Sequence, residues 1–366
     1  MKNKGGSALN YSFCKEYTLL PQSPIIHFQH YQDGATLRAT EVKPKLDKYI
    51  VKRYGKALPD EWKNKKSPNA LNYKLKIVCE NPQIVELGRN TDYEIFYANM
   101  GNQPEKKKTD RDIKKGILSE NKLTVICHIP DLLEFIDKII GDFFIVSNFG
   151  TMQDKGFGCY QAEGRVYSGS QIAKLLKDEY GASTCYSFRG RDQKEIFRNI
   201  KTIHNILKSG NPFSPKVGSL LYKYMNTLKI KNEKDWLNHN ASDEEAAYVR
   251  ALMGISDHMG PVKKPTTIAD ANTDKKTKIE RVPSPIWFVV SGNTVYFVGR
   301  RIPENLYGAE FVFESEDYKL NSGTLKVPDK ETIGENFIDK YLAFACNEFQ
   351  ALYNQRKIKI RVSEVK

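Results

Sequence analysis

Strand-like and helix-like segments alternate along almost the whole chain, and this interleaving limits the fold more than any single motif does. Apolar runs typical of strands lie at residues 73–79 and 123–128, and helical spacing of apolar residues fills 193–208. Near the end, Ser291-Gly292 marks a hairpin within 285–298, and a long amphipathic helix is predicted over 332–354. Interleaved elements of both kinds predict an α+β fold.

Two helices in the first half have predicted boundaries. One begins at Thr40, a plausible N-cap, and Pro44 would then lie in the first turn, where its missing N–H costs nothing. The other begins at Pro130 and is stopped by Gly141. Residues 56–72 are polar and basic and are predicted to form a loop.

The charge balance points to a polyanionic partner. The 366 residues include 57 Lys and Arg against 44 Asp and Glu, a net charge of +13, while 40% are hydrophobic. Phosphate contacts release counterions and steer association, so such a surplus favours nucleic acid. A protein that is basic without binding RNA has the same composition, so charge alone does not decide the question.

Several classes of protein are excluded by what the sequence lacks. No run approaches the ~20 apolar residues of a membrane-spanning helix, and the start lacks the apolar core of a secretory signal. The cysteines are scattered without CxxC spacing, so neither a zinc site nor a disulfide framework is predicted, and a reduced, cytoplasmic protein is expected. GxGxxG and GxxxxGK[ST] are both absent, and we expect no cofactor and no metal.

The glycine-rich segment 150–164 is the first candidate RNA-binding site. Glycine lets backbone N–H groups approach a phosphate closely, because no Cβ intervenes and positive φ costs little. Aromatic rings there could stack on bases, and nearby cations would add charge. The candidate residues of this segment are Gly150, Lys155, Gly156, Phe157, Gly158, Tyr160 and Arg165. A glycine turn with a packed Phe is the alternative interpretation.

Two basic surfaces are the other candidates. Arg38, Lys43 and Lys45 lie at the start of the first predicted helix, where the helix dipole also favours phosphate. Lys48 and Lys52 lie further along the same helix, and we expect them to form an ordinary solvent-exposed face without an RNA-binding role. The second surface precedes and follows the start of the helix 193–208, and it comprises Arg189, Arg191, Lys194, Arg198 and Lys201. Solubility explains this second surface equally well.

Three segments, taken in order, resemble the RAMP superfamily of CRISPR-associated RNA-binding proteins, especially the large subunits of type III effector complexes. The first is 18–50, where Ala39-Thr40-Glu41-Val42-Lys43-Pro44 stands in place of the family's small-residue, basic run, and Pro44 departs from it. The second is 147–160, in which Gly156-Phe157-Gly158 matches the family's glycine-rich loop while residues 151–155 replace its usual glycines and arginines. The third is the C-terminal strand, hairpin and helix from Ser284 onward.

This resemblance implies a fold, a domain plan and a set of partners. The fold would contain one or two ferredoxin-like (RRM-like) modules with a helical insertion. Residues 1–167 would form an N-terminal module ending in the glycine-rich loop, 168–281 a mainly helical insertion and linker, and 282–366 the strands and helix that complete a second module. The chain would hold guide RNA, target RNA or both within a ribonucleoprotein complex for antiviral defence, beside other protein subunits and away from membranes.

Catalysis is the alternative within the same family. Some relatives process guide RNA without metal through a histidine near the first helix, which makes His27 and His30 candidates, and others cut target RNA with an acidic loop residue placed like Asp33. Asp-Gly also simply makes turns, and a lone His is more often structural. The prediction is therefore a non-catalytic RNA-binding subunit, with an endoribonuclease or a scaffold that binds no nucleic acid as alternatives.

Overall fold

The computed structural model describes residues 13–26, 36–65, 67–88, 91–94, 114–211, 217–255, 258–259, 266–274 and 277–366. Within these ranges the chain forms two compact units, each with its own core. Unit 1 is drawn from residues 1–85, 115–151 and 157–167. Unit 2 is drawn from residues 86–114, 152–156 and 168–366. The predicted α+β fold is confirmed.

Unit 1 is a βαββαβ module. Its elements are β1 (Cys14–Pro21), α1 (Ala39–Tyr54), β4 (Lys74–Leu87), β5 (Lys114–Ile126), α2 (Pro130–Val146) and β6 (Tyr160–Ala162). The sheet has the order β4-β5-β1-β6, and β1 pairs antiparallel with both of its neighbours. This chain order and this strand order define a ferredoxin-like module.

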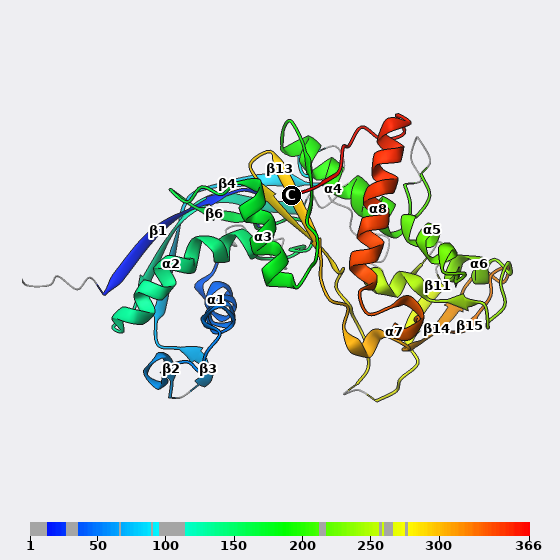
Figure 1. Ribbon diagram of the computed structural model, residues 1–366, viewed down its shortest axis with the longest axis horizontal. Helices are drawn as coiled ribbons and strands as arrows, with labels where there is room; N and C mark the ends of the chain where they lie inside the picture. The colour runs from blue at the N-terminus through cyan, green and yellow to red at the C-terminus, as the bar shows by residue number, and fades with distance from the viewer. Residues whose placement is uncertain are drawn as a thin grey trace, which may run out of the picture. The chain divides into compact units, whose positions relative to one another are not determined.

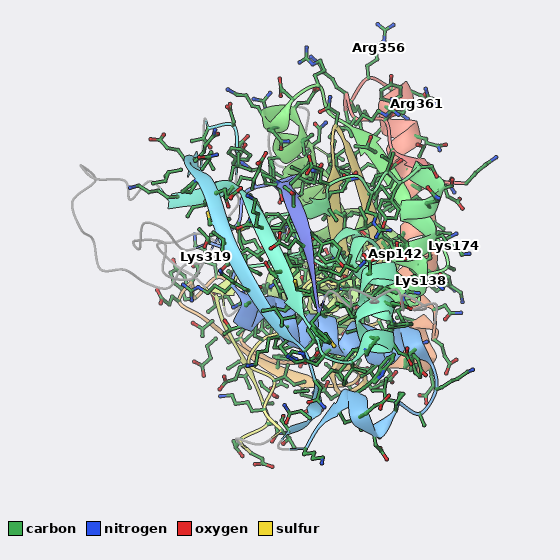
Figure 2. The ribbon with its side chains drawn as sticks, turned by 90° about the vertical axis from the view of Figure 1, so that its left-hand side faces the viewer. Lys138, Asp142, Lys174, Lys319, Arg356 and Arg361 are labelled. Carbon is green, nitrogen blue, oxygen red and sulfur yellow. The ribbon has the colours of Figure 1, made fainter. Side chains whose placement is uncertain are left out.

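Both helices of unit 1 lie on one face of its sheet (Figure 1). Leu123 and Val125 of β5 point to that face and are fully buried, and the Tyr17 hydroxyl donates to Asp137 of α2 at 2.9 Å. On the opposite face, no helix of the described residues covers β4, β5 and β1 (Figure 2). Residues 56–72, predicted as a loop, instead contain a 3-10 turn (Asp60–Trp62) and the paired strands β2 (Lys63–Asn64) and β3 (Ser67–Leu71).

The helix boundaries in unit 1 correct the sequence prediction in two places. Helix α1 begins at Ala39 with Arg38 as its N-cap, so Thr40 is not the cap and Pro44 lies in the second turn. Helix α2 does not stop at Gly141 but continues to Val146. A Cβ at Gly141 would collide with the Tyr167 hydroxyl, so this glycine permits close packing rather than ending the helix.

Unit 2 contains a second βαββαβ module. Its sheet has the order β12-β13-β7-β16, which repeats the strand order of unit 1. The elements in chain order are β7 (Tyr186–Arg189), α4 (Gln193–Lys208), β12 (Ile286–Ser291), β13 (Thr294–Gly299), α8 (Phe337–Asn354) and β16 (Ser363–Glu364). The predicted hairpin and the predicted helix 193–208 are confirmed. The closing helix begins at Phe337, because Gly334 ends the short helix α7 (Lys330–Ile333) first.

The remaining elements of unit 2 precede this module or are inserted in it. Helix α3 (Gly169–Tyr180) opens with a full capping box between Ser168 and Gln171 and packs on β13. A second sheet is formed by β10 (His258–Met259), β11 (Thr266–Asp270), β14 (Glu310–Ser315) and β15 (Gly323–Lys326). The other inserted elements are α5 (Leu220–Thr227), β8 (Lys231–Asn232), α6 (Glu233–Leu237), β9 (Ala246–Ala247), and the 3-10 turns η2 (Val249–Met253) and η3 (Glu304–Leu306).

Candidate nucleic-acid interface

The glycine-rich segment connects α2 to β6, and its glycines serve close packing. Gly150 and Gly158 have φ of +77° and +68°, which a residue with a Cβ rarely adopts. A Cβ on Gly150 would overlap with the Ile26 carbonyl oxygen, and one on Gly158 with the Phe149 carbonyl oxygen. These glycines are therefore required by the fold of unit 1.

The backbone donors of this segment are largely used by the protein itself. Phe149 N–H donates to the Gly158 carbonyl at 3.0 Å, and Gly158 N–H donates to the Pro24 carbonyl at 2.9 Å. Gly150 N–H donates to the Glu41 carboxylate at 2.7 Å. Gly156 N–H donates to the Gln153 carbonyl at 3.3 Å. The predicted phosphate cradle is corrected at these positions, because a donor already paired inside the protein is not available to a phosphate.

The two aromatic residues predicted to stack on bases are part of the core. Phe157 and Tyr160 are 2% and 1% exposed. Tyr160 packs against Phe149 with ring centroids 6.3 Å apart, and burial raises the pKa of its hydroxyl. A base can stack only on an exposed ring face, so this part of the prediction is wrong for the conformation described.

The two candidate lysines of α1, Lys43 and Lys45, are held by groups within unit 1. Lys43 Nζ binds the Asp47 carboxylate at 2.9 Å and the Leu71 carbonyl at 3.1 Å. Lys45 Nζ binds the Asn148 carbonyl at 2.7 Å and lies 4.6 Å from the centre of the Phe149 ring. Burial lowers the pKa of Lys45. Both lysines therefore stabilise unit 1, and contact with RNA stays a prediction for them.

The two arginines predicted in unit 1 are both exposed. Arg38, the N-cap of α1, makes no capping hydrogen bond with its side chain. Arg165, which follows β6, donates to the carbonyl of Asp137 at 3.0 Å and lies 3.3 Å from its carboxylate.

Carboxylates accompany the basic face of α4. Lys194 lies 3.7 Å from Asp92, while Lys201 and Arg198 lie 2.6 and 3.9 Å from Glu94. Both acids come from the short stretch 91–94 that follows β4. The sequence did not reveal this neutralisation, because about a hundred residues separate the acids from the helix. Arg191 pairs with Glu195 of the same helix, and Arg189 is exposed at the end of β7.

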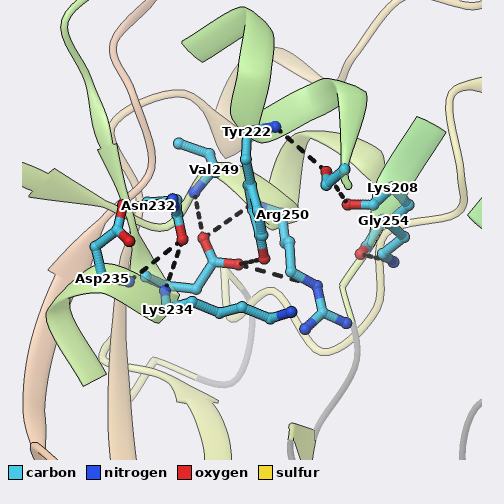
Figure 3. A network of polar contacts seen from close by, with 10 residues as sticks. Lys208, Tyr222, Asn232, Lys234, Asp235, Val249, Arg250 and Gly254 are labelled. Atoms are coloured by element: carbon cyan, nitrogen blue, oxygen red, sulfur yellow. Dashed lines mark hydrogen bonds and ion pairs between the residues drawn. The ribbon is translucent and has the colours of Figure 1, made fainter. Parts of the chain in front are cut away.

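A group of cations that the sequence did not connect includes Lys208, the last residue of α4. We define the cation cluster as Lys155, Lys208, Lys234 and Arg250. Lys155 was predicted as a site residue, but the other three come from α4, α6 and η2. Figure 3 shows the side chains of Lys234 and Arg250 running toward one another. Burial, and after it the charge of Arg250, lowers the pKa of both Lys208 and Lys234.

A second feature missed from the sequence follows α8. We define the basic strip as Arg356, Lys357, Lys359 and Arg361, all of which are exposed. Ile358, Ile360 and Val362 alternate with them and are buried. The alternation KIKIRV was a usable signal for an extended segment with one charged face. Arg356 and Arg361 project outward from the end of α8 and the segment that follows it (Figure 2).

The catalytic candidates His27, His30 and Asp33 lie outside the described residues. In the part of the chain that is described, no three His, Cys, Asp or Glu side chains are grouped to hold a metal ion. Over the same ranges, no helix has the length and apolar character needed to cross a membrane.

Comparison with known proteins places the chain in a family. The profile of the Cmr1 N-terminal domain matches residues 14–211, and that of the Cmr1 C-terminal domain matches residues 216–366. No curated protein matches the chain in sequence. Among solved structures, the apo form of Cmr1 from Pyrococcus furiosus is matched with 9% identity and a TM-score of 0.42, over 96% of this chain and 98% of that one. The resemblance to RAMP proteins is confirmed by the profiles, and the chain belongs to the Cmr1 family of subunits of type III CRISPR effector complexes.

Proposed function

We propose that this subunit binds RNA, guide or target, within its ribonucleoprotein complex, and that the basic strip is its main contact. The observation that carries the proposal is the alternation of buried and exposed residues between 357 and 362. Burial of Ile358, Ile360 and Val362 fixes the segment to unit 2, so its cations are held on the outer face. Ordered cations on an extended backbone suit the phosphates of a single strand.

The strip is poor in compensating charge. Residues 355–366 contain five Lys or Arg and a single acid, Glu364. On α4, by contrast, Asp92 and Glu94 accompany the cations. Exposed cations without carboxylate partners are available to neutralise RNA phosphates, and this neutralisation releases cations condensed on the RNA.

The pairing of the last strand supports adding a predicted residue to the proposed surface. β16 pairs antiparallel with β7, with Ser363 opposite Ser187. Continuing this register by two residues beyond β16 would set Arg361 beside Arg189, the exposed residue that ends β7. Arg189 and Arg191 therefore extend the proposed surface, while Arg38, Lys155 and Arg165 stay predictions outside it.

The position of the strip in the chain supports the same function. In unit 1 the glycine-rich segment joins the second helix of the module to its last strand. In unit 2 the basic strip makes the corresponding connection, from α8 to β16. In unit 1 this connection was predicted from the sequence to bind RNA. In unit 2 the corresponding connection carries the exposed cations of the basic strip.

Gel shifts or fluorescence anisotropy with single-stranded RNA at several salt concentrations test the proposal. Changing Lys357, Lys359 and Arg361 together to Gln should weaken binding on the order of 50-fold and reduce the salt slope by about 2. The matched control changes three exposed lysines elsewhere, Lys138, Lys174 and Lys319 (Figure 2), with the same loss of charge. Equal losses in both triple variants, or no RNA binding by the parent protein, would refute the proposal and leave a scaffold function.

A further inference from the structure

We propose that the ring of Tyr353 stacks on one base of the bound RNA, at the point where the basic strip begins. The inference rests on the proposed RNA-binding function and deepens it, because the strip holds phosphates while the ring holds a base beside them. A base inside a duplex has both faces covered by its neighbours, so the ligand must carry an unstacked base at this place.

Tyr353 lies on the last turn of α8, where the helix extends beyond the core of unit 2. Every fourth residue of α8 that leads to it is buried, namely Tyr341, Ala345 and Phe349. Tyr353 continues this column and is 40% exposed. Within the described residues its hydroxyl makes no hydrogen bond and its ring meets no other ring, whereas the buried Tyr341 donates its hydroxyl to the Leu207 carbonyl. Tyr353 therefore presents ring surface to solvent from a rigid element.

Backbone hydrogen bonds tie the start of the basic strip to this turn of α8. The Arg356 N–H donates to the Tyr353 carbonyl at 2.9 Å. The Lys357 N–H donates to the Leu352 carbonyl, also at 2.9 Å. The first two residues of the strip therefore fold back onto Leu352 and Tyr353. A ring and cations this close along the chain suit a base and the phosphates beside it, which is the combination that proteins use to hold single strands.

The turn between α8 and the strip holds Arg356 in a conformation that costs free energy. Its φ is +57°, in the left-handed region. The residue at this place after a helix is commonly Gly and sometimes Asn, because a Cβ is disfavoured there. Residues 349–363 contain no Asp or Glu, so no acid of this stretch neutralises the arginine. An arginine kept in a strained conformation, next to an exposed ring, indicates that its side chain has a role in binding.

Fluorescence anisotropy with a single-stranded RNA of mixed sequence tests the inference. Tyr353→Leu keeps an apolar side chain but removes the ring, and it should weaken binding on the order of tenfold, the effect of losing one stacked base. Tyr353→Phe keeps the ring and should bind within about twofold of the parent. The matched control, Tyr318→Leu, removes an exposed ring from the loop between β14 and β15, whose Lys319 lies well apart from Arg356 (Figure 2). It should leave RNA binding unchanged.

Three further readouts separate stacking from a structural role of Tyr353. The salt slope of Tyr353→Leu should equal that of the parent, because no charge is lost. The parent should prefer the RNA over an abasic strand of the same length on the order of tenfold, and Tyr353→Leu should lose this preference. Arg356→Gly should raise the urea midpoint of unfolding, because glycine accepts the positive φ, and yet weaken RNA binding. Melting curves show whether each variant is folded.

The outcomes separate this inference from the proposed function. If the parent binds the RNA and the abasic strand equally, or if Tyr353→Leu binds RNA as tightly as the parent, stacking on Tyr353 is overturned while RNA binding by the strip stands. Equal losses in Tyr353→Leu and Tyr318→Leu also overturn the inference. If Tyr353→Leu weakens binding but the triple Gln variant of the strip does not, the base contact stands and the strip is not the main contact. No RNA binding by the parent overturns both.

Discussion

The two ferredoxin-like modules share a topology but use the same connection in different ways. Between its second helix and its last strand, unit 1 has the glycine-rich segment, in which backbone N–H groups are bonded within the protein and the rings of Phe157 and Tyr160 are buried. Unit 2 has a segment whose alternate residues are exposed cations. The difference teaches that residue type alone does not locate an interface: the partners already present inside the protein decide which groups remain for a ligand.

The largest expected contrast is in stability. Gly158→Ala should destabilise the protein by ~3 kcal/mol or more, because a Cβ would overlap with the Phe149 carbonyl oxygen and φ is positive. Lys359→Ala in the basic strip should change stability by less than ~0.5 kcal/mol, because this exposed side chain has no buried role. Urea unfolding of both variants measures their free energies of unfolding. Equal losses in the two variants would contradict this prediction.

The smallest expected effect is on RNA binding by α1, the helix of unit 1 that corresponds to α4. Lys43→Met removes the contacts to Asp47 and to the Leu71 carbonyl and should lower stability by about 1 kcal/mol. Its RNA affinity should stay within about twofold of the parent. A large loss of RNA affinity in a folded Lys43→Met protein would show that α1 contributes to the interface after all.

The sequence was sufficient where the signal is local. Helix α4 runs over the predicted residues 193–208 because its apolar periodicity is strong and Asp192 caps it. Gly141 misled the prediction of α2, since a glycine that admits the Tyr167 hydroxyl looks in sequence like one that ends a helix.

The candidate site was less accessible, because it depends on which distant residues meet. Lys155 was a predicted site residue and stays a prediction, and its influence on the pKa of Lys208 depends on packing that the sequence does not reveal. Asp92 and Glu94 neutralise α4 across a long separation in the chain. The basic strip, in contrast, had a readable local pattern in Lys357 to Val362.

Ultraviolet crosslinking of the protein to single-stranded RNA, followed by cleavage after glutamate and mass spectrometry, tests the central claim most directly. Cleavage leaves the basic strip in the peptide 349–364 and all of the glycine-rich segment except Gly164 in the peptide 135–163. We predict crosslinked nucleotides on 349–364, and on the peptide 180–195 that carries Arg189. Crosslinks confined to 135–163, with none on 349–364, would contradict the account and return the interface to the glycine-rich segment.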